Sequence, residues 1–325
     1  MAQPDQSDDG HHEPPTVGDG DARAAGGDTR CGFVSIIGAP NAGKSTLTNA
    51  LVGTKVSIVS HKVQTTRAQI RGIALHGASQ IILVDTPGIF RPKRRLDRAM
   101  VEAAWGGARD ADAVVVLIDA AKGLDEDAEA ILRGSVNLGG SVVLTLNKID
   151  RIPKARLLEL AAKSAEFRTF DRVFMISALE GDGVNDLRDY LAGAVPPGPW
   201  LYPEDQISDA PQRHWAAEVT REKLYDRLHD ELPYASTVET TDWKTLKDGS
   251  TRIEQTIYVE REGQKKIVLG AGGATIKTIS MLAREELQEA LEGRVHLFLF
   301  VKVREKWGDD PERYREMGLE YPKGE

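Results

Sequence analysis

The sequence predicts a two-domain α/β protein, in which a doubly wound domain on a parallel sheet precedes a smaller α+β domain. Three observations predict this fold. Between residues 31 and 197, apolar runs each end in a short polar motif. Helical patterns such as 125–136 and 154–167 lie between those runs, as a parallel sheet requires. Beyond the prolines at 195–199, the chain resumes with another helical pattern and alternating strands.

These patterns divide the chain into five segments. We expect a disordered acidic tail at 1–30, the first domain at 31–197, a linker at 198–211, the second domain at 212–306 and a C-terminal tail at 307–325. The first segment has seven acidic and two basic side chains and little to bury, which favours disorder. Because it carries −5 of the net charge of −8, the low pI of about 5.5 does not exclude a nucleic-acid partner.

Composition limits the class of protein. With 41% hydrophobic residues, the 325-residue chain can form two packed cores. The longest apolar stretches, such as Ala113–Ile118, are far shorter than the roughly 18 residues that span a bilayer, and no signal peptide opens the sequence. The single cysteine, Cys31, precludes an internal disulfide and suits a reducing compartment. We therefore expect a cytoplasmic protein.

The first motif is a glycine-rich loop that directly follows the apolar run 33–37. Such a loop between strand and helix presents backbone N–H groups to the α- and β-phosphates of a nucleotide. Lys44 adds a charge toward the β/γ-phosphates, and Ser45 offers a hydroxyl to Mg²⁺. The alternative is a glycine-rich turn without a ligand. The residues expected to contact the nucleotide here are Gly38, Ala39, Pro40, Asn41, Ala42, Gly43, Lys44, Ser45 and Thr46.

A second motif, Asn147-Lys148-Ile149-Asp150, ends the apolar run 142–146 and indicates which base is bound. The Asp150 carboxylate can accept from guanine N1–H and N2–H₂, whereas adenine would leave its charge unpaired. Asn147 would tie this segment to the phosphate loop, and the Lys148 stem would cover one face of the base. Ser177-Ala178 follows the run 173–176, so the Ala178 N–H is expected to donate to guanine O6. Alone, the second motif would equally fit a solvated turn.

A third motif, Asp85-Thr86-Pro87-Gly88-Ile89, closes the apolar run 81–84. We expect Asp85 to hold Mg²⁺ through water and the Gly88 N–H to reach the γ-phosphate. Within Gln64–Arg67, Thr66 is favoured over Thr65 to complete the Mg²⁺ shell, although an ordinary polar loop is the alternative. The expected metal ligands are therefore Ser45, Thr66 and Asp85. Together these motifs predict a P-loop GTPase domain.

The predicted chemistry is slow GTP hydrolysis. The best-studied GTPases orient the attacking water with a glutamine after Asp-x-x-Gly, but here the next residues are Ile89–Pro92. The remaining catalytic candidates are Lys44, Thr66, Gly88 and Asn41. We hypothesise that the Asn41 amide helps to hold K⁺ beside the phosphates, and the alternative is an asparagine that bonds its own backbone.

The second domain has the element order α-β-β-α-α-β. A helical pattern at 212–232 precedes strands at 234–241 and 252–260, then come Lys265–Leu269, the loop Gly270–Gly273, a helix at 274–291 and a strand at 294–303. Gly-x-x-Gly between adjacent helices is typical of a type II KH domain, which clamps single-stranded RNA. Alone, the loop would more often be a helix C-cap and turn, but the apolar residues before it, the helix after it and the flanking strands favour the KH interpretation. Against it, residues 212–325 carry 19 basic and 22 acidic side chains. The RNA-binding candidates are Lys265, Lys266, Gly270, Gly272, Gly273 and Lys277.

From Cys31 to Tyr321 the chain resembles the Era family of bacterial GTPases. The stretches that carry the resemblance are Gly38–Thr46, Gln64–Arg67, Tyr202–Asp209, Ala217–Lys223, Glu231–Tyr234 and Val301–Trp307. The resemblance implies a GTPase that binds the 3′ end of 16S ribosomal RNA and the 30S subunit, assists small-subunit assembly, and attaches peripherally to the cytoplasmic face of the inner membrane. It also implies GTP contacts along Gly38–Ser45, Asp85–Ile89, which includes Thr86, Pro87 and Ile89, and Asn147–Asp150, and RNA contacts along Lys265–Lys277. Ala271 departs from the family, whose members usually place a lysine within the glycine loop.

We expect a monomer in which GTP, through Mg²⁺ and the γ-phosphate, orders the loops of Thr66 and Gly88 and shifts the KH domain. A rival reading is an RNA-binding module that uses GTP structurally with little turnover. A transfer-RNA-modifying relative would need a further catalytic or cofactor motif, and a translocation or signalling GTPase would lack the Gly270 loop.

Overall fold

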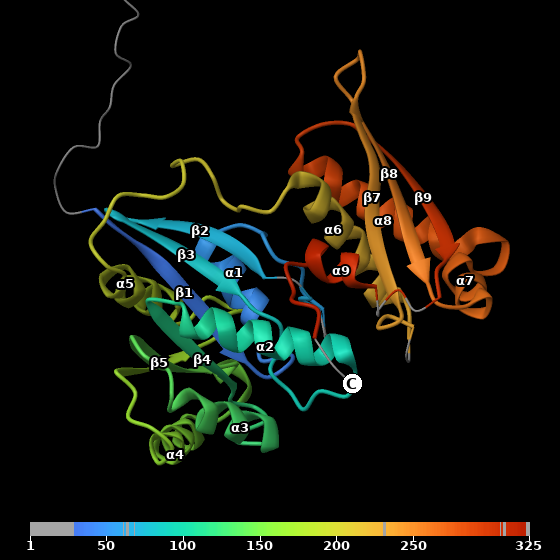
Figure 1. Cartoon of the computed structure of the whole chain (residues 1–325). Helices are drawn as coiled ribbons and strands as arrows, with labels where there is room; N and C mark the ends of the chain where they lie inside the picture. The colour runs from blue at the N-terminus through green and yellow to red at the C-terminus, as the bar shows by residue number, and fades with distance from the viewer. Residues whose placement is uncertain are drawn as a thin grey trace, which may run out of the picture.

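The structure, a computed structural model, describes residues 29–60, 62, 65–67, 69–229, 232–305, 307 and 310–322, and it shows two domains side by side (Figure 1). The predicted acidic tail at 1–30 lies outside the described residues except for its last two positions, as does Gln64. No helix in the described ranges is both long and apolar enough to cross a membrane.

The first domain is built on a six-stranded sheet with the order β2-β3-β1-β4-β5-β6. The strands are β1 (Arg30–Gly38), β2 (Ile70–His76), β3 (Ser79–Asp85), β4 (Ala113–Asp119), β5 (Ser141–Asn147) and β6 (Arg172–Ile176). Neighbouring strands pair in parallel, except that β2 runs antiparallel to β3. The sequence pattern predicts the parallel strands, and it does not predict β2.

Helices cover both faces of this sheet, as in a doubly wound fold. On one face lie α1 (Lys44–Val52) and α5 (Val184–Ala194). On the other lie α2 (Arg95–Arg109), α3 (Glu126–Ser135) and α4 (Lys154–Ala165). The helices predicted at 125–136 and 154–167 are thus confirmed, and Asp125 begins α3 as its N-cap by accepting from the Ala128 N–H (2.9 Å).

The topology brings the three motifs together. Strand β1 lies between β3 and β4, so the chain turns to opposite sides of the sheet on either side of it. In open α/β sheets this point, outside the carboxyl ends of the strands, is where ligands bind. The phosphate loop follows β1, the Asp85 motif follows β3, and the Asn147 motif follows β5, so all three meet at one edge of the sheet.

The second domain has the predicted order α-β-β-α-α-β. Its elements are α6 (Gln212–Arg227), β7 (Ser236–Thr245), β8 (Thr251–Val259), α7 (Glu262–Leu269), the 3₁₀ turn η2 (Ala271–Gly273), α8 (Ala274–Ala290) and β9 (Val295–Val303). Strand β8 pairs antiparallel with β7 and parallel with β9. Helices α6 and α8 pack on one face of this sheet and bury Leu224, Ile279 and Leu287 against it.

The predicted linker lies along the sheet of the first domain. The Ile73 N–H donates to the Ile207 carbonyl (2.9 Å), and Ser208 forms an antiparallel bridge with Gly72 of β2. Nearer the first domain, the Gln80 side chain accepts from the Leu201 N–H (2.9 Å). The linker is therefore anchored over much of its length and extends the β2 edge of the sheet.

The last described residues return to the first domain. The helix α9 (Pro311–Glu316) follows the buried Trp307. Trp307, Tyr314 and Leu319 pack against Leu96, Ala99 and Met100 of α2. The segment treated in the sequence analysis as a C-terminal tail thus forms part of the contact between the domains.

Candidate functional site

Two glycines shape the phosphate loop because no larger residue fits. Gly43 has a φ of +100°, and a Cβ there would lie 2.3 Å from Asn147 Nδ2. A Cβ on Gly38 would lie 2.5 Å from the Leu117 carbonyl oxygen. Between them Asn41 adopts a left-handed φ of 63°, a conformation that asparagine tolerates better than most residues. The loop backbone is therefore held close to β4 and to the Asn147 motif.

Lys44 lies beneath this loop as a buried cation. Its ammonium donates to the carbonyls of Gly38 (3.2 Å) and Ala39 (3.0 Å). Burial lowers the pKa of Lys44 to about 8, and the nearby Asp85 carboxylate opposes that shift. A bound polyphosphate would favour the charged form, so Lys44 is suited to recognise an anion.

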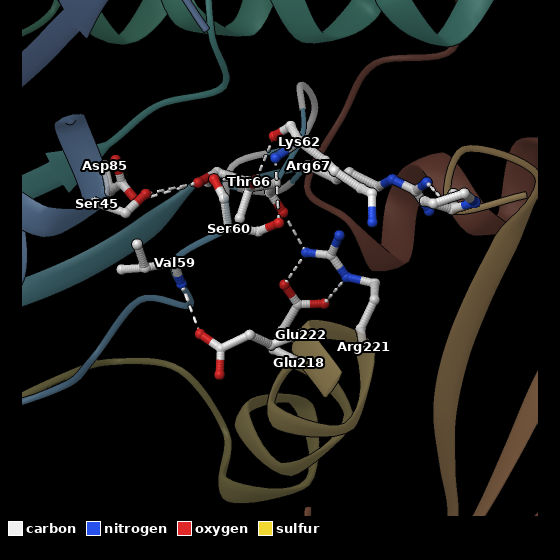
Figure 2. Close-up of polar contacts among 12 residues, drawn as sticks. Ser45, Val59, Ser60, Lys62, Thr66, Arg67, Asp85, Glu218, Arg221 and Glu222 are labelled. Carbon is white, nitrogen blue, oxygen red and sulfur yellow. Dashed lines mark hydrogen bonds and ion pairs between the residues drawn. The ribbon is translucent and has the colours of Figure 1, made fainter. Parts of the chain in front are cut away.

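The three predicted metal ligands converge on one point (Figure 2). The Ser45 hydroxyl donates to Asp85 Oδ2 (2.8 Å) and lies 3.0 Å from Thr66 Oγ1, which itself lies 3.3 Å from Asp85 Oδ2. Thr65 instead donates to the Lys62 carbonyl (2.7 Å). Asp85 is fully buried, which raises the pKa of its carboxyl, and its Oδ1 has no hydrogen-bond partner among the described residues. Hard oxygens with an unsatisfied buried carboxylate atom fit Mg²⁺.

The Asn147 side chain ties three loops together. Its Nδ2 donates to the Ala42 carbonyl (2.8 Å), and its Oδ1 accepts from the Ala178 N–H (2.9 Å). The predicted tie to the phosphate loop is thus confirmed. The Ala178 N–H already has an acceptor in Asn147, so its donation to guanine O6 stays a prediction.

Lys148 and Asp150 complete the base side of the site. Lys148 donates to the Asn41 carbonyl (2.6 Å) and forms an ion pair with Asp119 (2.5 Å). A hydrogen bond from Ser177 lowers the pKa of Asp150, so its carboxylate is charged at neutral pH. Asp119 was not singled out from the sequence, although it ends the apolar run of β4 in register with Asn147.

A cavity of about 200 Å³ lies between these segments. The predicted residues that line it are Pro40, Asn41, Gly43, Lys44, Ser45, Thr46, Thr66, Gly88, Asn147, Lys148, Asp150, Ser177 and Ala178. The other predicted nucleotide contacts, Gly38, Ala39, Ala42, Asp85, Thr86, Pro87 and Ile89, are not part of its lining. Among these, Thr86 donates to the Ile36 carbonyl (2.8 Å) and the Ile89 N–H donates to the Gly38 carbonyl (3.0 Å). These two bonds attach the Asp85 motif to β1 and to the start of the phosphate loop.

Some residues that line the cavity were not predicted from the sequence. The unpredicted lining residues are Ile58, Val59, Ser60, Lys62, Arg151, Leu179 and Thr65, the threonine that was disfavoured as a metal ligand. Ile58, Val59, Ser60 and Lys62 come from the irregular segment between α1 and β2, where no periodicity marks their position. The one sequence feature that could have indicated a role in the cavity is their proximity to Thr66.

The glycine loop of the second domain is shaped by backbone conformation. Gly270 has a φ of +73°, and a Cβ there would lie 2.2 Å from Thr275 Oγ1. Gly272 and Gly273 also have positive φ, of 57° and 80°. Lys266 and Lys277 are exposed on either side of the loop, and Lys265 is half-buried. The predicted RNA-contacting residues are thus gathered on α7, the loop and the start of α8.

Comparisons with known proteins agree with this geometry. Residues 33–148 match the model of a 50S ribosome-binding GTPase family, and residues 231–308 match a KH domain. GTPase Era of Brucella suis biovar 1 is 68% identical over 294 residues, which is 90% of this chain and 94% of that protein. The chain belongs to the Era family of GTPases. GTPase Era of Agrobacterium fabrum is 62% identical and covers 97% of this chain and 98% of its own length.

Solved Era structures share the whole architecture. A crystal structure of Era in complex with MgGDPNP and nucleotides 1506–1542 of 16S ribosomal RNA superposes with a TM-score of 0.85 at 37% identity, covering 90% of this chain and 99% of that one. A variant of Aquifex aeolicus Era bound to GDP·AlF₄⁻ gives the same TM-score and identity, over 89% and 99%. The chain is thus a GTPase with a P-loop domain followed by a type II KH domain, as the sequence predicted.

Proposed function

We propose that this GTPase is a nucleotide-driven switch that binds the 3′ end of 16S ribosomal RNA through its KH domain and assists assembly of the 30S subunit. The solved Era complex with nucleotides of 16S ribosomal RNA supports the RNA partner. The observation that carries the switch is the position of Thr66, which lies 3.0 Å from Ser45 while its neighbours Thr65 and Arg67 bond to the KH domain.

In this proposal, each motif has one task. Ser45 and Thr66 contact Mg²⁺ directly and Asp85 contacts it through water, so that the ion neutralises charge on the β- and γ-phosphates. Lys44 binds the same phosphates, and the Gly88 N–H donates to the γ-phosphate. Asp150 selects guanine. The solved Era complex with MgGDPNP supports GTP and Mg²⁺ as ligands.

Hydrolysis in this proposal is slow without a partner. The residues directly after Gly88, Ile89–Pro92, include no glutamine to orient water. A Cβ on Gly88 would lie 3.0 Å from Pro40, so the Gly88 loop packs closely on the phosphate loop. Charge stabilisation then comes from Lys44, Mg²⁺ and, in our hypothesis, a K⁺ ion held with the help of Asn41. Equal turnover in K⁺ and Na⁺ buffers would count against the K⁺ role.

Two measurements test the switch. Phosphate release should rise when 30S subunits are added, whereas a module that uses GTP only structurally would show negligible release in both conditions. RNA affinity should be higher with a non-hydrolysable GTP analogue than with GDP, because only the analogue orders the Thr66 and Gly88 loops. Identical RNA affinities with the two nucleotides would refute coupling.

The remaining family properties stay predictions. Cytoplasmic location, peripheral attachment to the inner membrane and the monomeric state rest on the resemblance and on composition. Flotation with inner-membrane vesicles and sedimentation of the purified protein would test attachment and oligomeric state in turn.

A further inference from the structure

Two adjacent residues connect the proposed metal site to the KH domain. Thr66 and Arg67 are 6% and 4% exposed. Figure 2 shows their side chains extending in different directions, with Thr66 toward Ser45 and Asp85, and Arg67 away from them. Because neighbouring Cα atoms are only about 3.8 Å apart, one residue cannot move far without the other.

The Arg67 guanidinium lies in a cage of carbonyls and rings from the KH domain and the C-terminal segment, with Glu218 and Arg221 close enough to act on its charge. It donates to the carbonyls of Ser236 (2.8 Å) and Pro233 (3.1 Å), and it lies over the rings of Tyr225 (5.7 Å) and Trp307 (5.3 Å). These groups come from α6, the start of β7 with the segment before it, and the segment after β9. A planar fork that donates to two carbonyls while it stacks on rings is specific to arginine, because a lysine ammonium can lie over a ring but has no planar fork.

Further contacts hold the same loop against α6, among them the Lys62 ammonium, which donates to the carbonyls of Tyr225 and Leu228. The Val59 N–H donates to Glu222 (2.7 Å). Arg221 donates to the Thr65 carbonyl, and Glu218 orients that guanidinium by accepting from its Nε (2.7 Å). The loop is therefore fixed to the KH domain before and after Thr66, and Arg67 is the buried charged side chain that the loop itself inserts into that domain.

We propose that Arg67 is a positioning residue that makes placement of Thr66 at the metal site and docking of the KH domain a single equilibrium. This inference rests on the proposed function and names the residue that carries its regulation. With Mg²⁺ and a γ-phosphate, Thr66 is held beside Ser45 and Arg67 enters its cage. With GDP, Thr66 loses its partner and Arg67 leaves. Because such coupling is reciprocal, RNA that favours the docked arrangement raises affinity for the GTP analogue by the same factor.

The first test compares Arg67→Ala and Arg67→Lys with Arg156→Ala, which removes an exposed arginine from α4 in the full chain. The readout is the ratio of affinities for a 16S 3′-end RNA with a non-hydrolysable GTP analogue and with GDP. Arg67→Ala should lower this ratio about fivefold or more, with little rescue by Arg67→Lys, while GDP affinity stays within about twofold. Arg156→Ala should match the wild type. An unchanged ratio in Arg67→Ala would overturn the proposal.

A second readout needs no RNA. Spin labels at Glu159→Cys on α4 and Glu289→Cys on α8, in a Cys31→Ser background, report the distance between the domains. With the GTP analogue, Arg67→Ala should broaden a distribution that is narrow in the otherwise unaltered chain. Tyr225→Leu removes a ring of the same cage from α6 if Arg67→Ala folds poorly, and it should broaden the distribution likewise.

The two readouts separate the inference from the function on which it rests. If Arg67→Ala broadens the distances although the wild type binds RNA equally with both nucleotides, the proposed switch fails and the positioning role stands. If the wild type shows the RNA difference and neither Arg67→Ala nor Tyr225→Leu alters the affinity ratio or the distances, the switch stands and the positioning role is wrong.

Discussion

The two glycine loops of this GTPase are built in different ways. Around the phosphate loop, side chains from distant elements hold the backbone, since Asn147 donates to the Ala42 carbonyl (2.8 Å) and Lys148 to the Asn41 carbonyl (2.6 Å). The Gly270–Gly273 loop instead has an exposed centre whose shape follows from three positive φ values. The first loop is thus pre-organised by a side-chain network and the second by glycine conformation, so their sensitivities to mutation should differ.

The largest expected effect comes from removing the carboxylate that reads the base. Asp150→Asn should weaken GDP binding by roughly a thousandfold or more, because an amide cannot accept from both guanine N–H groups and instead presents a donor. Titration with GDP and with inosine diphosphate, which lacks the N2 amino group, measures this. The variant should bind the two alike. Asp186→Asn, at an exposed position on α5, is the control; if Asp150→Asn retains full GDP preference, base selection lies elsewhere.

Next in size is Gly43→Ala, which places a Cβ 2.3 Å from Asn147 Nδ2. The clash would displace the side chain that links three loops, so GDP affinity should fall about a hundredfold. Gly53→Ala is the matched control for Gly43→Ala, because Gly53 also has a positive φ (+88°) but a Cβ there would meet no atom within 4 Å. That control should cost only about 1–2 kcal/mol of stability and leave GDP affinity unchanged. Equal affinities in the two variants would show that the network does not shape the loop.

The corresponding substitution in the glycine loop of the KH domain should lower the affinity for RNA and leave the affinity for nucleotide unchanged. Gly270→Ala puts a Cβ 2.2 Å from Thr275 Oγ1, whereas Gly272→Ala, with φ +57°, meets nothing within 4 Å. We expect RNA affinity to drop about thirtyfold in Gly270→Ala and less in Gly272→Ala, with GDP affinity intact in both. Fluorescence anisotropy with a labelled RNA gives the first value and nucleotide titration the second. A larger loss in Gly272→Ala would show that open space around the loop matters more than its fold.

A pH titration sharpens the description of the nucleotide loop. With its pKa lowered to about 8 in the free protein, Lys44 is protonated below that pH and must take up a proton to bind phosphate above it. GDP affinity should therefore be flat below about pH 8 and fall by up to tenfold per pH unit above it. Calorimetry in buffers of different ionisation enthalpy should detect proton uptake at alkaline pH. The exposed-lysine control Lys154→Gln should show the same profile, and the absence of proton uptake would mean that Lys44 is already charged.

The smallest effect concerns the departure at Ala271. Ala271→Lys restores a cation in the exposed loop, so RNA affinity should rise about threefold and the slope of log affinity against log salt should steepen by about 0.7. Ala271→Met has similar length without charge and serves as the control. An equal gain in both variants would assign the effect to contact area.

Much of this could be predicted from sequence because the motifs lie at the ends of strands. Asn147, Asp85 and Ser45 each follow or close an apolar run, and the parallel topology then requires them to meet. The β2 strand escaped prediction because Gly72 interrupts its pattern. That glycine is needed for packing, since a Cβ there would lie 2.8 Å from Val52 Cγ2.

What could not be predicted depends on contacts between distant segments. Val59 lines the cavity because Glu222 of the other domain accepts from its N–H, and no local pattern encodes that partner. Burial of Trp307 depends likewise on its packing against α2. Sequence patterns report local geometry and burial, whereas these positions are set by how two folded units pack together.

The linker that follows the first domain also protects it. Its Ile207 carbonyl accepts from the Ile73 N–H (2.9 Å), so the outer side of β2 is occupied by the chain's own backbone. A fragment cut at residue 197 would present that side to solvent, where unsatisfied amides and carbonyls invite strand addition by a second copy. A fragment extended through Asp209 would keep this flank closed. The linker thus also prevents the first domain from pairing through β2 with a second copy.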